Sequence, residues 1–178
     1  MEIEEIRKSI ERLGPIVKKA KRPRKEFKQN KEIKNFEDTI KKNYKEFAQE
    51  IIENSNGKLL VLAGESFGIL LKARGISSNQ LRNIFGYVKK IECGIKGNKN
   101  EKLLGNVMLK LRLLLPKISY IIGRERNYES KEMLEILRSF FGECIEKING
   151  DKSKFALFVD TFESILSYHK YYGEDKQG

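Results

Sequence analysis

Apolar residues recur at helical spacing along most of the chain. Over residues 31–54, Ile, Phe and Tyr side chains fall on one stripe of a helix, and most of the lysines lie elsewhere. The same spacing returns over residues 130–148 and again over residues 155–173. Each of these segments is therefore predicted to be an amphipathic helix that turns one face toward a shared core.

Two further helices are predicted in the middle of the chain. The apolar run at 59–62 could begin a strand, but no partner strand is visible elsewhere, so we expect a helix that Gly75 caps at its C-terminus. Ser77 and Gln80 have the spacing of a capping box, in which each side chain satisfies a free amide of the first helical turn. A new helix is therefore expected to begin at this serine.

The most apolar stretch runs from Leu103 to Arg126. Its leucine, isoleucine, valine and methionine residues cover almost the whole circumference of a helix, which predicts an element buried on most sides. Pro116 cannot donate a helical hydrogen bond, so it either kinks this helix or begins a new one in its first turn. Because the stretch ends in Arg124 and Arg126, we expect this core helix to place positively charged side chains at the surface.

The N-terminal part of the chain is more polar. The spacing of apolar residues over 2–13 predicts a short helix, which Gly14-Pro15 is expected to end. Residues 18–28 are strongly basic and contain a proline. They suit either a flexible arm that touches phosphates or a solvated linker, and the pattern alone does not decide between the two.

Helical spacing throughout predicts an all-α fold, a single-domain bundle of about five or six helices. We divide the chain into an N-terminal helical, lysine-rich extension over residues 1–54, a helical core over 55–173 and a tail over 174–178. The low proline count and the abundance of Lys, Glu, Leu and Ile agree with helices rather than sheets.

The net charge of +11 at pH 7 adds information about partners. An excess of this size favours a polyanion, either nucleic acid or an anionic membrane surface, and plain solubility is the alternative. No uninterrupted apolar run approaches the roughly 20 residues of a membrane span, and the N-terminus lacks the apolar region of a secretory signal. We therefore expect a soluble, cytoplasmic protein.

Candidate catalytic and metal-binding residues are sparse. Cys93 and Cys144 have no metal-ligand spacing, and the single histidine, His169, falls on an apolar stripe, where a packed role is favoured. Residues 64–68, GESFG, have the form of a hydrolase nucleophile elbow, but that motif requires a strand before the serine within an α/β sheet. We therefore expect no enzyme activity, no metal site and no cofactor.

Basic residues next to the predicted apolar stripes are the remaining candidates for function. Their position beside packed helices holds them in place, and the tyrosines interleaved with them could stack on bases or pack the bundle. We expect them to contact a sugar–phosphate backbone without reading its sequence. The candidate residues for binding a nucleic-acid backbone are Arg82, Lys89, Lys90, Lys110, Arg112, Lys117, Arg124, Arg126 and Lys170.

Three segments together resemble the small subunit of the type III-A CRISPR effector, the Csm complex. Residues 76–92, ISSNQLRNIFGYVKKIE, resemble a family segment in which a Ser or Thr cap precedes a Gln-hydrophobic-Arg start. Residues 113–124, LLLPKISYIIGR, are similar to the family's Leu-x-Pro-Lys and Gly-Arg pattern, with Ser119 where alanine is usual. Residues 155–173 end in YHKYYG, close to a family signature. The likeness covers about residues 64–173.

The resemblance implies a non-enzymatic helical subunit that stacks in copies along the effector. Its implied partners are CRISPR RNA, target RNA, the backbone subunit and the large polymerase-like subunit, with no membrane. The resemblance makes five matched basic residues candidate contacts to the backbone of the target strand, and it leaves sequence reading to base pairing. These residues are Arg82, Lys89, Lys90, Lys117 and Arg124. Two alternatives stay open: a purely structural assembly subunit, and the small subunit of type III-B complexes.

Overall fold

The structure is a computed structural model that describes residues 2–97, 99, 102–103 and 105–173. The all-α bundle is confirmed, because the regular elements of the described residues are all helices and only an isolated bridge joins Lys102 to Asp151. The described residues form more helices than the five or six predicted. The basic segment at 18–28 contains a short helix, and the apolar stretch from Leu103 to Arg126 forms two helices. The predicted tail at 174–178 lies outside the described residues.

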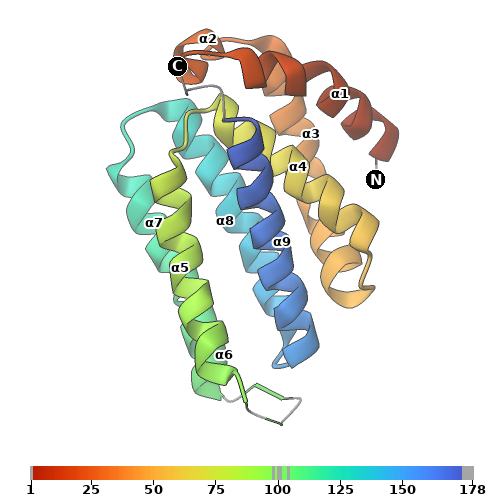
Figure 1. Ribbon diagram of the computed structural model, residues 1–178, viewed down its shortest axis with the longest axis vertical. Helices are drawn as coiled ribbons and strands as arrows, with labels where there is room; N and C mark the ends of the chain where they lie inside the picture. The colour runs from red at the N-terminus through yellow and green to blue at the C-terminus, as the bar shows by residue number, and fades with distance from the viewer. Residues whose placement is uncertain (1, 98, 100–101, 104, 174–178) are drawn as a thin grey trace.

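The centre of the bundle is the pair formed by α4 (Gly57–Ala73) and α9 (Lys152–Tyr171), which run side by side (Figure 1). An added Cβ atom at Gly64 would lie 2.7 Å from the Cβ of Ser164, and one at Gly68 would lie 2.8 Å from the backbone nitrogen of His169. The two helices therefore approach more closely than side chains at these glycines would permit.

This close packing explains the GESFG segment. Ser66 is fully buried in the middle of α4, and its Oγ donates a hydrogen bond of 2.7 Å to the carbonyl of Leu62. No strand precedes it, so the segment is not a nucleophile elbow. The helix predicted here is confirmed, and Gly75 follows it with a φ of +73°, the left-handed conformation expected of a C-terminal cap.

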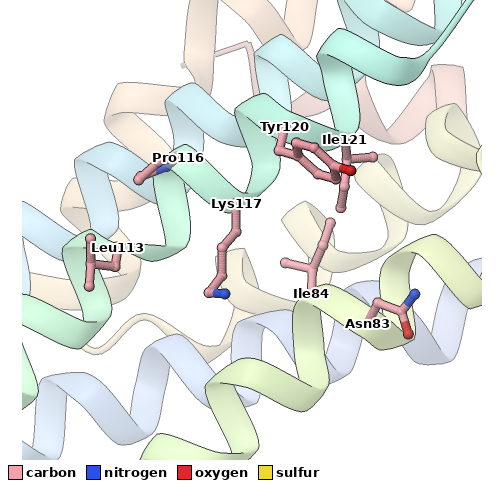
Figure 2. Close-up of a pocket in the computed structure, with 7 residues that line it drawn as sticks. All are labelled: Asn83, Ile84, Leu113, Pro116, Lys117, Tyr120 and Ile121. Carbon is pink, nitrogen blue, oxygen red and sulfur yellow. The ribbon is translucent and has the colours of Figure 1, made fainter.

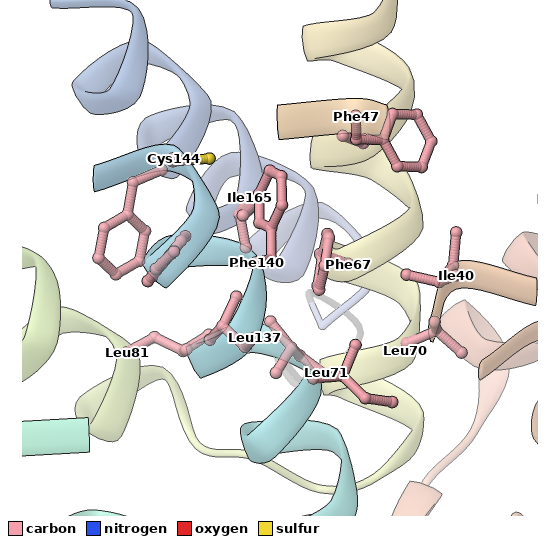
Figure 3. Packing of buried hydrophobic residues seen from close by; sticks show 14 of the residues in the cluster. Ile40, Phe47, Phe67, Leu70, Leu71, Leu81, Leu137, Phe140, Cys144 and Ile165 are labelled. Carbon is pink, nitrogen blue, oxygen red and sulfur yellow. The ribbon is translucent and has the colours of Figure 1, made fainter. Parts of the chain in front are cut away.

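A layer of aromatic side chains joins the centre to the helices on either side. α8 (Tyr128–Ile148) packs against α4, α9 and α3 (Lys31–Ala48), and α3 continues into a π-helical turn, η1 (Gln49–Glu53). Figure 3 shows Phe67 of α4 next to Phe140 of α8, and their ring centroids are 4.8 Å apart. Across α9, α5 (Ser78–Ile95) joins the core through Phe85, whose ring meets that of Phe162 edge to face.

The N-terminal helix α1 (Ile3–Lys19) lies across one end of the bundle (Figure 1). The prediction that Gly14-Pro15 ends this helix is wrong, because the helix continues for four residues beyond the proline. An interior proline costs about 3 kcal/mol. The apolar stripe nevertheless runs on to Val17, which is fully buried and helps to offset that cost.

The basic segment at 18–28 is packed on the bundle, so the interpretation as a flexible arm is wrong. It contains a short helix, α2 (Pro23–Glu26), and the next residue, Phe27, is buried. The carbonyl of Phe27 accepts a hydrogen bond of 2.7 Å from the guanidinium of Arg74, which is buried and also holds the carboxylate of Glu37 at 2.5 and 2.7 Å. This network joins α2, α3 and the end of α4.

The most apolar stretch forms two helices, α6 (Gly105–Arg112) and α7 (Leu114–Arg124), at the edge of the bundle. Of the two alternatives for Pro116, a kink or a new helix, the structure has the second, because α7 begins at Leu114 and Pro116 lies in its first turn. The prediction of burial on most sides is wrong, since Leu109 and Leu113 are 59% and 45% exposed. The interior is already filled by α4, α8 and α9, so only one stripe of α6 and α7 can be buried.

Candidate RNA-contact surface

α5, α6 and α7 form one edge of the molecule, on the left in Figure 1. Most of the predicted RNA-binding residues lie on these three helices or directly after α7. Seven of them are exposed, and six of these seven form no ion pair within the described part of the chain. This set, called the cationic edge below, comprises Arg82, Lys90, Lys110, Lys117, Arg124 and Arg126.

The other three predicted residues are placed differently. Lys89 pairs with Glu92 one turn further along α5, and the hydrogen bond between them raises the pKa of the lysine. The Nε atom of Arg112 lies 3.3 Å from the carboxylate of Glu146 on α8. Lys170 is exposed on α9, outside the three helices of this edge. Two of these three residues therefore share their charge with an acid, and the third lies on another helix.

The capping box predicted at the start of α5 is confirmed. The backbone N–H of Ser77 donates to the side chain of Gln80 at 2.9 Å, and the N–H of Gln80 donates back to the Ser77 hydroxyl at 3.2 Å. Further along, Tyr87 donates its hydroxyl proton to the carbonyl of Lys110 at 2.9 Å, and the Nζ atom of Lys117 lies 4.6 Å from the centre of its ring. These contacts join α5 to α6 and α7.

A groove of about 590 Å³ lies between α5 and α7. In Figure 2, Ile84 points up from α5 toward Tyr120 and Ile121 of α7, and Lys117 extends from α7 toward α5. The lining, called the α5–α7 groove below, comprises Asn83, Ile84, Leu113, Pro116, Lys117, Tyr120 and Ile121. A second hollow of about 380 Å³ shares Asn83, Tyr120 and Ile121 with the first and extends it toward Arg124.

The charge around this groove is positive on balance. Arg124 lies over the ring of Tyr120, 5.6 Å from its centre, and donates a hydrogen bond of 3.2 Å to the tyrosine hydroxyl. Glu125 is the carboxylate of the second hollow, and its Oε1 atom is 3.0 Å from Arg24. Burial opposes its charged form, but hydrogen bonds from the N–H groups of Asn127 and Arg126, together with Arg24, lower its pKa overall.

The single histidine has a packed role, as predicted. His169 is 1% exposed, and its Nε2 atom is 2.9 Å from the carbonyl of Ile76. Burial lowers the pKa of its imidazole to about 4, so the ring is neutral at pH 7. Among the described residues, no group of three or more His, Cys, Asp or Glu side chains could hold a metal ion.

Sequence reasoning identified the cations of the groove but not its walls. Asn83 was not among the predicted site residues, and Tyr120 was one of several tyrosines with an undecided role. Asn83 and Tyr87 are four residues apart, which places them on the same face of α5, but only the contact with α7 makes that face the wall of a groove.

None of the helices in the described part of the chain is sufficiently long and apolar to span a bilayer.

Fold and surface together define a class: an all-α protein with a cationic, grooved edge. A family model described as Csm2 Type III-A matches residues 54–175, and the chain belongs to this family, which is that of the small subunit of the type III-A CRISPR effector. No curated protein and no solved structure shows significant similarity to the chain. The resemblance noted from sequence is confirmed, and the matched residues include all nine predicted RNA-binding positions.

Membership in this family also indicates which complex the protein is part of and which CRISPR type it belongs to. Small subunits of this family are structural components of the effector, and the chain is accordingly a component of a Csm complex. The family match favours the type III-A assignment over the type III-B alternative.

Proposed function

We propose that the chain is a non-enzymatic subunit that binds the backbone of target RNA and CRISPR RNA without sequence specificity. The observation that carries this proposal is the cationic edge, whose six exposed cations have no acidic partner among the described residues. Cations of this kind attract phosphates equally for every sequence, because phosphates carry no base identity. Pairing between guide and target then supplies the sequence reading.

The proposal includes stacking of several copies along the effector. One copy offers few phosphate contacts, so its binding alone is expected to be weak. Copies fixed next to one another on the same RNA raise the effective concentration of each binding surface, and the assembly then binds much more tightly than one subunit. The backbone subunit and the large polymerase-like subunit are the expected neighbours, in the cytoplasm.

Salt dependence of RNA binding tests this function. The double variant Lys117→Ala with Arg124→Ala removes two cations of the edge, and we expect the slope of log affinity against log salt to decrease by about 1.4 for single-stranded RNA. The loss of affinity is expected to be equal for unrelated sequences. Fluorescence anisotropy with two labelled oligonucleotides, over a series of KCl concentrations, measures both quantities.

A matched control is the double variant Arg7→Ala with Lys8→Ala. It removes the same charge from exposed positions on α1, the helix that packs on α3 and α4 at the upper right of Figure 1. We expect the salt slope of this variant to stay close to that of the unmodified protein. An equal loss in both double variants would show attraction to net charge alone and would refute the assignment of the surface.

A purely structural assembly subunit is the second candidate, and one observation favours it. Leu109 and Leu113 are large, exposed apolar side chains beside the cationic edge, and such residues are common where proteins meet. If RNA affinity is absent at low salt while Leu113→Ser prevents incorporation into the complex, this candidate replaces the RNA-binding one.

A further inference from the structure

Tyr120 is unusual among the aromatic residues because it is 65% exposed although it lies within a helix rather than at one of its ends. It borders both hollows between α5 and α7. Arg124 contacts the ring, and no other aromatic ring lies near it among the described residues. An exposed aromatic ring in a groove offers a flat apolar face for another flat ring.

The groove supplies the other parts that a nucleobase requires. Its floor is apolar, formed by Ile84, Pro116 and Ile121. At its rim the side-chain amide of Asn83 is exposed and has no hydrogen-bond partner within the described part of the chain. An amide both donates and accepts hydrogen bonds, as do the edges of bases. Figure 2 shows Asn83 on α5 and Tyr120 on α7 on either side of the opening.

Charge favours a nucleic acid over a protein segment as the occupant. Lys117 and Arg124 stand along the groove on the α7 side, two turns apart. The carboxylate of Glu125 is paired with Arg24 and accepts hydrogen bonds from backbone N–H groups, which reduces its repulsion of an anion. A polyanion with flat apolar rings complements both the cations and the apolar floor.

We propose that the α5–α7 groove takes an unstacked base of single-stranded RNA. The base stacks on Tyr120, its edge meets the amide of Asn83, and the adjoining phosphates lie at Lys117 and Arg124. This inference rests on the proposed RNA-binding function but adds to it, because contact would then extend from the backbone to bases. The stacking is tolerant of sequence, since every base has a flat face.

The test uses the full chain and single-stranded RNA of 12 nucleotides, measured by anisotropy at several KCl concentrations. From the usual contribution of one stacked base, we expect Tyr120→Ala to weaken binding roughly 5- to 150-fold. The salt slope is expected to stay unchanged, because no charge is removed. Tyr120→Phe should restore most of the affinity, because it keeps the ring and loses only the hydroxyl contact with Arg124.

Two controls make the result specific to base stacking. Tyr128→Ala removes a tyrosine that is 69% exposed but lines a different hollow, formed by α3, α8 and the far side of α7 at Ile122, and we expect it to leave RNA affinity unchanged. An RNA of the same length made entirely of abasic nucleotides keeps its phosphates and lacks its bases. On this ligand Tyr120→Ala should bind as well as the unmodified protein.

Each remaining outcome has a distinct meaning. If the unmodified protein binds RNA with a steep salt slope and Tyr120→Ala binds equally well, the base site is refuted while the proposed function stands. If Tyr120→Ala changes only self-association, measured by sedimentation, the groove is a contact between protein copies and the inference is likewise refuted. If the unmodified protein has no affinity for RNA at low salt, the proposed function fails together with the base site.

Discussion

Because α4 and α9 approach each other closely at Gly68, we predict that adding a single methyl group there destabilises the protein. Gly68 has no side chain, and an added Cβ atom would lie 2.6 Å from the Cβ of Tyr168, 2.8 Å from the nitrogen of His169 and 3.0 Å from the carbonyl carbon of Tyr168. Two of these three atoms belong to the backbone of α9, so no side-chain rotation relieves the contact. The substitution Gly68→Ala therefore has to push the two central helices apart.

The expected size of the effect follows from two opposing contributions. Alanine in the interior of a helix is about 1 kcal/mol more favourable than glycine. Overpacking of a well-packed core costs about 1–3 kcal/mol, and contact with backbone atoms places Gly68→Ala near the upper end of that range. We expect a net loss of about 1–2 kcal/mol in the free energy of unfolding.

Gly86 on α5 provides a matched control. It is also inside a helix, but an added Cβ atom there has no other atom within 4 Å. Gly86→Ala is therefore expected to gain about 1 kcal/mol without any overpacking cost. The two variants should differ by about 2–3 kcal/mol although they make the same chemical change.

Thermal and urea unfolding followed by circular dichroism measure this difference. For a chain of this length, about 1 kcal/mol corresponds to about 2–4 °C in Tm, so the two variants should be separated by roughly 4–12 °C. Equal shifts of Tm in the same direction would show that the helices are not in close contact at Gly68. In that case the explanation of the GESFG segment by helix packing would also be wrong.

Three further predictions concern buried polar groups and the cysteines. Arg74→Met leaves the carboxylate of Glu37 buried without its partner and is expected to cost about 3–5 kcal/mol, measured by urea unfolding. The pKa of His169 is lowered by burial from 6.5 to about 4, so its contribution to stability is complete above pH 6.5 and is lost as the pH falls toward 4, by up to about 3 kcal/mol. His169→Gln should remove this part of the pH dependence of the free energy of unfolding, and an unchanged profile would contradict the assignment. Cys93 is exposed and should react with a thiol reagent in the native protein, whereas Cys144 is buried, which raises the pKa of its thiol, and should react only after unfolding.

Most of the helices could be predicted from the sequence because the residues that begin and end a helix act within one or two turns of the chain. The capping box of Ser77 and Gln80, the cap at Gly75 and the new start near Pro116 each depend on atoms within one helical turn. The all-α class and the packed role of His169 followed from the same periodicity. These features needed no knowledge of which helices are neighbours.

The errors arose where distant parts of the chain decide the outcome. Pro15 does not end α1, because the stripe that continues to Val17 is buried against other helices. The basic segment containing Arg24 is held by Glu125 and Ser130, which lie about a hundred positions further along the chain. Contacts of this range leave no trace in local spacing, so a charge run that was read as an arm or a linker is part of the packed structure.

The apolar stretch from Leu103 to Arg126 shows why burial cannot be read from hydrophobicity alone. A helix with apolar residues all round is buried only if enough neighbours surround it. Here α6 and α7 lie at the edge of the bundle, and Leu109 and Leu113 remain exposed because the core does not cover them. Leu113 lines the α5–α7 groove together with Tyr120 and Lys117. An exposed apolar surface of this kind is typical of a site where another molecule binds. The excess hydrophobicity of this stretch is therefore better explained by an interface than by the core.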